Sequence, residues 1–212
     1  MKIIIYTLFG ALFFLGLISI SWRFFSERYS LPCPSWLGWM IELDNPFAKS
    51  THSHTIIKHL KLETGIKVLD IGCGPGRLTI PIAKIIGSQG EILAVDMQAE
   101  MLSKIKEKAK KANLSNIRYL ETKIGKKTLI QDHFDRALLI SVLGEIPDKE
   151  KCLQEVFHAL QPGGILIIAE TIFDPHFQSK NKVFSLVTKI GFRLIETSGN
   201  FLSYNMLLEK PQ

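Results

Sequence analysis

The sequence has little cysteine. Only Cys33, Cys73 and Cys152 occur among its 212 residues. Their number is odd, they are far apart, and none has a histidine or a second cysteine at the spacing of metal ligands. These features exclude a disulfide framework and a cysteine-based zinc site, and they favour a reducing compartment. No metal is expected, and the sequence contains no internal repeat or low-complexity tract.

Charge is missing from a stretch near the amino terminus. Between Ile3 and Trp22 the sequence IIIYTLFGALFFLGLISISW has no charged residue. About 20 apolar residues suffice for a helix to span a bilayer. A cleaved signal peptide is the alternative, but Lys2 alone is a thin charged region and no small-residue cleavage site precedes Arg23. We therefore expect residues 1–25 to form an uncleaved, single-pass membrane anchor.

A connector, residues 26–49, follows the expected anchor. Three prolines break regular structure in it, and Trp36 and Trp39 are three residues apart. On a short helix the two indoles would share a face. They would then pack on the core, line an apolar substrate entrance, or lie at the headgroup level of a bilayer. Packing on the core is the leading expectation.

The excess of positive charge does not by itself identify a partner. The net charge is +6 and the pI is near 9.2. Five lysines between residues 104 and 111 lie in a helix-like stretch, so we expect a solvated helix face. Basic and aromatic residues are not interleaved as in nucleic-acid readers, and no nucleic acid is expected as a partner.

The remainder, residues 50–212, has the alternating pattern of an α/β domain. Apolar β-type runs such as IKVLDI, GEILAVD, DRALLIS and GGILIIAET alternate with segments of helical periodicity. Pro162 and Gly163 predict a turn before the last of these runs. The end, FRLIETSGNFLSYNMLLEK, holds two alternating runs that predict a β-hairpin. The sequence therefore predicts one domain with a mostly parallel sheet and one antiparallel strand.

A glycine-rich loop follows the first expected strand in VLDIGCGPGRLTIPIA. Glycines there let the backbone bend and let a ligand approach it closely at a helix amino terminus. The dinucleotide fingerprint G-x-G-x-x-G is not met, because Arg77 occupies its sixth position. Asp70 would repel a pyrophosphate but suits a ligand with a cationic group. Asp96, about 20 residues further on, is placed to bind a ribose diol, so the expected ligand is a nucleoside with a cationic tail.

Four motifs carry a resemblance to a known family: VLDIGCGPGRLT, ILAVDMQAEML, FDRALLISVLGEIPD and LQPGGILIIAE. They occur in the family's order, and the chain resembles the class I, Rossmann-like S-adenosylmethionine-dependent methyltransferases similar to the ubiquinone/menaquinone biosynthesis group (type 11). The resemblance implies a doubly wound, mostly parallel seven-stranded sheet with one antiparallel strand. It also implies that S-adenosyl-L-methionine is the cofactor.

The resemblance also implies roles for individual residues. Asp70 would neighbour the methionine part of the cofactor, Asp96 would hold the ribose hydroxyls and Met97 would pack on adenine. The pocket would be shaped by the loop residues Gly72, Cys73, Gly74 and Gly76. The sequence departs from the family after the third strand, where LETKIGKKT lacks the aspartate of many relatives. Thr122, Lys123 or a backbone amide would then contact the adenine.

Catalysis by such a domain rests mainly on alignment of the acceptor with the methyl group. If the acceptor must lose a proton, the candidates are Glu145 after the fourth strand, and Glu170, Asp174 and His176 after the fifth. A capping or loop role is an equal alternative for each. His52, His54 and His59 precede the first strand and are expected at the surface, with a role in a lid over the cleft as the alternative.

These inferences together predict a membrane-anchored methyltransferase. Its acceptor would be a small, lipophilic molecule such as a lipid or a quinone precursor. A protein or nucleic-acid acceptor, or cofactor binding without chemistry, are the alternatives. Because S-adenosylmethionine is made in the cytoplasm, we expect the catalytic domain there, and Arg23 and Arg28 after the span agree with this orientation.

Overall fold

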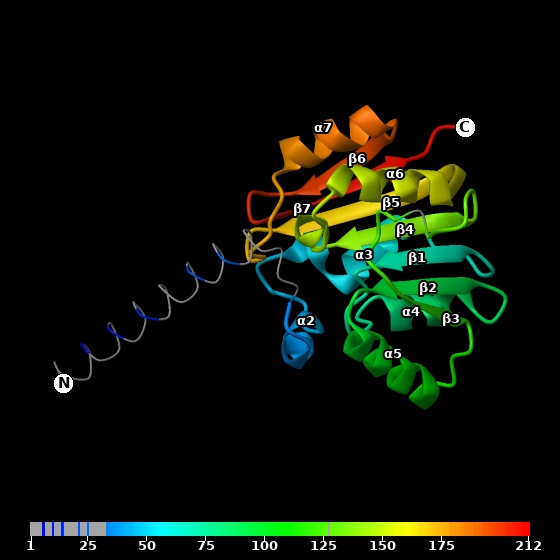
Figure 1. Ribbon diagram of the computed structural model, residues 1–212, viewed down its shortest axis with the longest axis horizontal. Coiled ribbons are helices and arrows are strands. Elements are labelled where there is room, and N and C mark those ends of the chain that lie inside the picture. Colours follow the sequence, from blue (N-terminus) through cyan, green and yellow to red (C-terminus); the bar gives the residue numbers. More distant parts are fainter. Residues whose placement is uncertain are drawn as a thin grey trace.

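The computed structural model describes residues 33–212 except 127, together with the single residues 6, 10, 14, 21 and 25. Seven strands form one sheet in the order β3-β2-β1-β4-β5-β7-β6 (Figure 1). The strands are β1 (Lys67–Ile71), β2 (Glu91–Asp96), β3 (Ile117–Glu121), β4 (Phe134–Ile140), β5 (Leu160–Thr171), β6 (Arg193–Gly199) and β7 (Ser203–Glu209).

All neighbouring strands from β3 to β5 pair in parallel, and β7 is antiparallel to both β5 and β6. The prediction of a mostly parallel seven-stranded sheet with one antiparallel strand in a carboxyl-terminal hairpin is confirmed. The hairpin turn forms where Asn200 Oδ1 accepts hydrogen bonds from the backbone amides of Leu202 and Ser203. Asparagine favours turns because its side chain bonds nearby backbone in this way.

Helices cover both faces of the sheet. They are α2 (Gly38–Ile41), α3 (Ser53–Leu60), α4 (Thr79–Ile86), α5 (Ala99–Lys111), α6 (Lys149–Ala159) and α7 (Lys180–Ile190), with short 3-10 turns η1 (Ser35–Leu37), η2 (Lys49–Thr51) and η3 (Leu143–Glu145). One core cluster packs α6 and α7 against the sheet, and the other packs α3, α4 and α5. The fold is therefore doubly wound, and the central strands direct their carboxyl ends toward the side where α2 lies (Figure 1).

Helical periodicity in the sequence correctly indicates the buried faces. Met101, Leu102, Ile105 and Ala109 of α5 are buried, as their i, i+3, i+4 spacing requires. Helix α6 begins where Asp148, a good N-cap residue, accepts a hydrogen bond from the backbone amide of Lys151. Burial of these apolar faces against the sheet is what holds the two helical layers in place.

The structure differs from the sequence-based expectation at two places. Pro162 and Gly163 do not form a turn before β5, because β5 already begins at Leu160. The register of β5 against β4 shifts between Phe134 and Arg136. The two residues lie in this irregular part of the strand, where the Gly163 amide donates to the Lys210 carbonyl. Helix α7 was not recognised in the sequence, although Val183 and Val187 are buried at helical spacing.

The expected membrane anchor, residues 1–25, lies outside the described residues apart from five single positions. In the described part of the chain no helix has the length and hydropathy that crossing a membrane requires. The anchor therefore stays a prediction, and the boundary of the folded domain is set by contacts of the connector described below.

Candidate active site

The glycine-rich loop connects the end of β1 to α4 at the carboxyl edge of the sheet. Gly72 has a φ of +65°, and a Cβ at this position would overlap the side chain of Val142. Glycine is the residue that adopts this conformation without strain. The backbone amides of Gly72 and Cys73 both donate to the Val95 carbonyl, at 2.8 and 3.1 Å. The loop is thus held against the end of β2, which brings Asp96 beside it.

Asp96 is the last residue of β2 and is only 8% exposed. Its carboxylate accepts a hydrogen bond from the Gly74 amide at 3.0 Å and another from the Gln98 amide at 2.9 Å. Burial raises the pKa of this carboxyl group, and the backbone hydrogen bonds act in the opposite direction. Asp96 therefore lies beside the glycine-rich loop, and its expected role in binding ribose stays a prediction.

A cavity of about 460 Å³ opens beside the loop. Its volume is within the range usual for small-molecule sites. Most of its lining is apolar and comes from the ends of β1, β2 and β4, and from the connector through Met40, Ile41 and Leu43. The polar part of the lining includes three carboxylates, Asp96, Glu145 and Asp174.

The structure brings most of the predicted site residues to this cavity. The predicted residues that line it are Gly72, Gly74, Asp96, Met97, Thr122, Lys123, Glu145, Asp174 and His176. Four others, Asp70, Cys73, Gly76 and Glu170, lie next to the lining without contributing to it. The amide of Thr122 donates to the backbone carbonyl of Asp96 at 3.1 Å, so the segment after β3 is fixed to the end of β2.

Asp70 lies beneath the loop rather than in the cavity. Its side chain is 3% exposed and accepts a hydrogen bond from the Thr79 hydroxyl at 2.6 Å. Burial raises the pKa of Asp70 to about 7. Thr79 is the first residue of α4, so this contact joins β1 to the helix that follows the loop. The contact explains the residue structurally without a ligand.

Cys73 and Gly76 also contribute to the shape of the glycine-rich loop. Cys73 is buried, and burial raises the pKa of its thiol far above its usual range. Such a thiol is not a nucleophile at neutral pH. Gly76 has a φ of +90°, and its amide donates to the Cys73 carbonyl at 3.1 Å. These residues shape the backbone that borders the cavity.

Glu145 and Asp174 are the carboxylates that the loops after β4 and β5 contribute to the cavity. Burial raises the pKa of Glu145 to about 8, and repulsion by Asp174 and Asp96 adds to the effect. A hydrogen bond from the backbone amide of Cys33 acts in the opposite direction. A carboxyl group with a pKa near the working pH can both hold and release a proton. Glu145 is therefore suited to proton transfer with a bound molecule.

His176 lies at the same part of the cavity in the loop after β5. It is 5% exposed, and its amide donates to Asp174 Oδ1 at 2.7 Å. Gly144 approaches the His176 backbone so closely that a Cβ would overlap the carbonyl oxygen. The two loops after β4 and β5 are thereby packed together, which places Glu145, Asp174 and His176 in one wall.

Glu170 lies in β5, behind this wall. Its side chain is 1% exposed, and Oε2 accepts a hydrogen bond from the Gln178 amide at 3.2 Å. Among the described residues Oε1 has no hydrogen-bond partner. Burial raises the pKa of Glu170 to about 8. Its placement favours a buried, largely protonated group over direct contact with a ligand.

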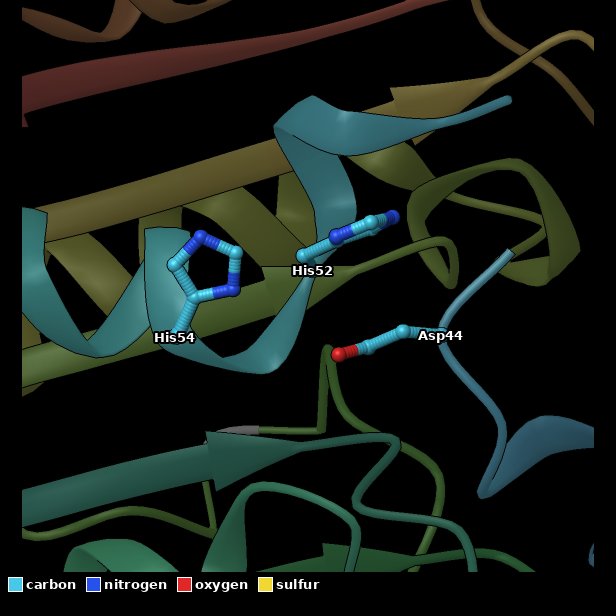
Figure 2. A group of neighbouring side chains, drawn as sticks. All are labelled: Asp44, His52 and His54. Carbon is cyan, nitrogen blue, oxygen red and sulfur yellow. The ribbon is translucent and has the colours of Figure 1, made fainter. Parts of the chain in front are cut away.

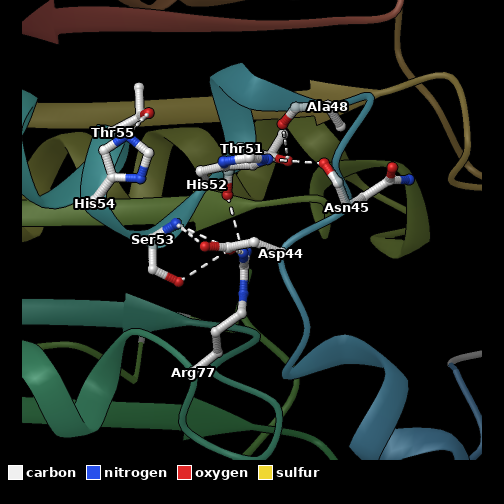
Figure 3. A network of polar contacts seen from close by, with 9 residues as sticks. All are labelled: Asp44, Asn45, Ala48, Thr51, His52, Ser53, His54, Thr55 and Arg77. Carbon is white, nitrogen blue, oxygen red and sulfur yellow. Dashed lines mark hydrogen bonds and ion pairs between the residues drawn. The ribbon is translucent and has the colours of Figure 1, made fainter.

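The connector is held against the domain at a polar junction that the sequence did not reveal. Arg77 donates to Asp44 Oδ1 at 2.6 Å and to the Thr51 carbonyl at 2.9 Å, while Asp44 also accepts from the amide and hydroxyl of Ser53 (Figure 3). These bonds hold the pKa of Asp44 below its usual value, although burial opposes them. Because Arg77 also lines the cavity, the junction fixes one of its walls.

Asp44, His52 and His54 form a group with the composition of a metal site (Figure 2). His52 Nε2 lies 2.7 Å from the Asn45 carbonyl, which can only accept, so Nε2 is the donor in this contact. The Arg77 guanidinium, however, already neutralises Asp44. A cation would be repelled by this neighbour, so we assign the group to the junction and not to a metal. Of the three histidines in this region only His54 is exposed, and His52 and His59 are half-buried.

Two lysines of α5 also hold the connector. Lys104 Nζ donates to the Ser35 carbonyl, and Lys108 Nζ lies 2.6 Å from Glu42 Oε1. The expectation of a wholly solvated lysine face is therefore wrong for these two residues, whereas Lys106, Lys110 and Lys111 are exposed. Long-range bonds of this kind have no signal in local sequence.

The tryptophan pair of the connector does not pack on the core. Trp36 is 72% exposed and Trp39 is 61% exposed. The expectation that they cap the core is wrong, because the buried contacts of this segment are made by its neighbours. Gly38 is buried against Met101 and Lys104 of α5, and this contact turns both indoles outward.

Comparison with known proteins decides the family. A family model described as a methyltransferase domain matches residues 62–203, which is well over half of the chain. The chain belongs to this family. Among solved structures, a SAM-dependent methyltransferase from Aquifex aeolicus superposes with a TM-score of 0.73, covering 84% of this chain and 99% of that one. At 21% identity this likeness shows the fold.

Curated relatives place the chain near one group of S-adenosylmethionine-dependent methyltransferases. The ubiquinone/menaquinone biosynthesis C-methyltransferase UbiE of Vibrio vulnificus is 31% identical over 115 residues, which is 52% of this chain and 44% of that protein. Demethylmenaquinone methyltransferase of Staphylococcus aureus is 31% identical over 116 residues, or 55% and 47%. The chain spans about half the length of the curated relatives it matches. The expected resemblance and its cofactor, S-adenosyl-L-methionine, are confirmed.

Proposed function

We propose that this methyltransferase transfers a methyl group to a lipophilic small molecule of the quinone-precursor type. The observation that carries the proposal is the composition of the cavity. A buried carboxylate beside the glycine-rich loop, Asp96, and an ionisable group of raised pKa, Glu145, border one mostly apolar space. The names of the relatives, which refer to ubiquinone and menaquinone, support an acceptor of this class.

The residues around the glycine loop fit S-adenosylmethionine. Asp96 can accept hydrogen bonds from two ribose hydroxyls, because an ionised carboxylate has more acceptor sites than its two backbone donors use. The exposed side chain of Met97 and the segment at Thr122 line the adjacent wall, where they would contact adenine. When bound, the cofactor supplies a methyl group that is already activated by its positive sulfur.

The acceptor would bind against the wall of the cavity that contains Glu145 and His176. Methylation of a ring carbon or a hydroxyl releases one proton, and Glu145 is placed to take it up in its ionised form. His176 and Asp174 lie in the same wall and would orient the acceptor by hydrogen bonds. The apolar residues between the two polar ends exclude water from the reacting groups.

We further propose that residues 1–25 anchor the protein in a membrane and that the domain faces the cytoplasm, where the cofactor is made. The support is the uncharged apolar run of the sequence. Deleting these residues should release a soluble domain that still binds S-adenosylmethionine. Protease added to intact cells should spare the domain and cut it only after lysis. Digestion from outside would contradict the orientation.

Transfer of a labelled methyl group tests the reaction itself. The purified protein is incubated with methyl-labelled S-adenosylmethionine and either a bacterial membrane lipid extract or chemically reduced demethylmenaquinone. Label in the organic phase is the expected result. The matched control is Asp96→Ala, which should transfer less label than the natural protein at the same, limiting cofactor concentration. Label that stays with added protein or nucleic acid, and never enters the organic phase, would contradict the proposed acceptor class.

A further inference from the structure

Large apolar side chains are exposed on the connector and on the loops at the carboxyl edge of the sheet. We call six of them the apolar rim: Trp36, Trp39, Leu43, Phe47, Phe173 and Phe201. Four belong to the connector, Phe173 follows the end of β5, and Phe201 lies in the turn before β7. Ser203 pairs with Thr171, so this turn is at the same carboxyl edge of the sheet. The rim therefore gathers side chains from segments far apart in the sequence.

Contacts show that the segments of the apolar rim adjoin one another. The rings of Phe47 and Phe173 have centroids 6.3 Å apart. The Ile172 amide donates to the Leu202 carbonyl at 2.9 Å, which joins the loop after β5 to the hairpin turn. Leu43 and Phe173 also line the cavity. Leu43, Phe47 and Phe173 thus extend the apolar lining of the cavity outward. Trp36 and Trp39 belong to the same connector, whose residues Cys33, Pro34 and Met40 also line the cavity.

The composition and position of the apolar rim point to a lipid bilayer as its occupant. Exposed apolar groups gathered in this way mark an interaction site, and indoles favour the headgroup level of a membrane. The uncharged run ends at Trp22, and ten residues separate it from Cys33. An extended chain of that length reaches at most about 40 Å, which keeps the rim near any membrane that holds the run.

Charge at the edge of the rim agrees with an anionic lipid surface. Lys49, Lys123 and Lys180 are exposed. Lys49 follows Phe47 by two residues, Lys123 lines the cavity, and Lys180 lies in a small hollow with Phe201. The acidic connector residues Glu42 and Asp44 are instead paired with Lys108 and Arg77. Exposed lysines near a membrane are attracted to anionic headgroups.

We propose that the apolar rim inserts into the interfacial layer of an anionic bilayer, so that the cavity opens directly onto the membrane. A lipophilic acceptor then enters from the bilayer without crossing water. This inference rests on the membrane attachment and acceptor class proposed above. It assigns to the folded domain a contact that the anchor alone would not require.

Fluorescence of the rim tryptophans tests the inference in the full-length chain. The variant Trp22→Phe leaves Trp36 and Trp39 as the only indoles. It is reconstituted in vesicles of phosphatidylcholine and phosphatidylglycerol at about 7:3, with or without brominated acyl chains. If the rim is inserted, brominated lipid should quench the emission by at least about half. The control has all three tryptophans replaced by Phe and carries Ile130→Trp, an exposed site before β4, and it should not be quenched.

Three results would overturn the proposal, and they are distinguishable. Unquenched Trp36 and Trp39 in protein that still cosediments with the vesicles would show that the domain stands away from the membrane, while anchoring and methyl transfer remain intact. Absence of cosedimentation would refute membrane attachment itself. Protection of the two indoles from acrylamide that depends on protein concentration and needs no lipid would assign the rim to a second copy of the chain.

Discussion

Replacement of Glu145 by glutamine tests the acceptor end of the cavity. Burial raises the pKa of Glu145 to about 8, and Asp174 and Asp96 contribute by repulsion. If its ionised form takes up the proton, about a tenth of the free protein is active at pH 7 and about nine tenths at pH 9. We therefore expect kcat/KM of the natural protein to rise about tenfold between these two pH values.

The Glu145→Gln variant keeps the shape of the side chain but cannot accept the proton. Its kcat/KM should be lower by about 10²- to 10⁴-fold and should not rise with pH. Initial rates of labelled methyl transfer, measured at limiting cofactor concentration, report the ionisation of the free protein. Glu170→Gln is the matched control, because Glu170 also has a raised pKa but does not line the cavity. If kcat/KM of the natural protein did not change with pH, or if kcat/KM of the Glu145→Gln variant still rose with pH, Glu145 would not be the group that takes up the proton.

Two further predictions concern stability and the connector. Because burial raises the pKa of Glu170 from 4.5 to about 8, the folded protein holds a proton that the unfolded chain releases between these values, and stability falls as pH rises across them. In urea unfolding, the free energy of unfolding should fall less between about pH 5 and pH 8 in Glu170→Gln than in the natural protein. An equal fall in both would contradict the raised pKa of Glu170. Arg77→Ala removes the charge beside Asp44, so Zn²⁺ should raise the Tm of this variant but not that of the natural protein. Equal stabilisation of both would show that the Asp44–His52–His54 group binds metal without the substitution.

The fold could be predicted where structure is encoded locally. The apolar runs of β1, β2 and β4 and the periodic face of α5 carry their patterns within a few residues. The hairpin of β6 and β7 is likewise encoded by two alternating runs around a turn. Helix α7 was not predicted from the sequence, although Val183 and Val187 give it a buried face. The irregular start of β5 depends on pairing with β4 and with Lys210. These partners are distant in the sequence, so no local pattern predicts the irregularity.

The candidate site was predictable in part for the same reason. The glycine loop and Asp96 are signalled by spacing, and the structure brings them together. The direction of each side chain is not signalled, so Asp70 and Glu170 could not be separated from the residues that line the cavity. The contribution of the connector was also hidden, because it depends on Arg77, Lys104 and Lys108 reaching across from distant segments.

Binding of S-adenosylmethionine to the purified protein tests the central claim most directly. Calorimetric titration should show one site per chain in the natural protein. Asp96→Ala should weaken that binding by about 1–3 kcal/mol, the usual cost of losing hydrogen bonds to a charged group. A thermal unfolding curve confirms that the variant is folded, and Asp70→Asn, which alters a carboxylate outside the cavity lining, should change the affinity less. Equal affinity in folded Asp96→Ala and natural protein would contradict the proposed cofactor site.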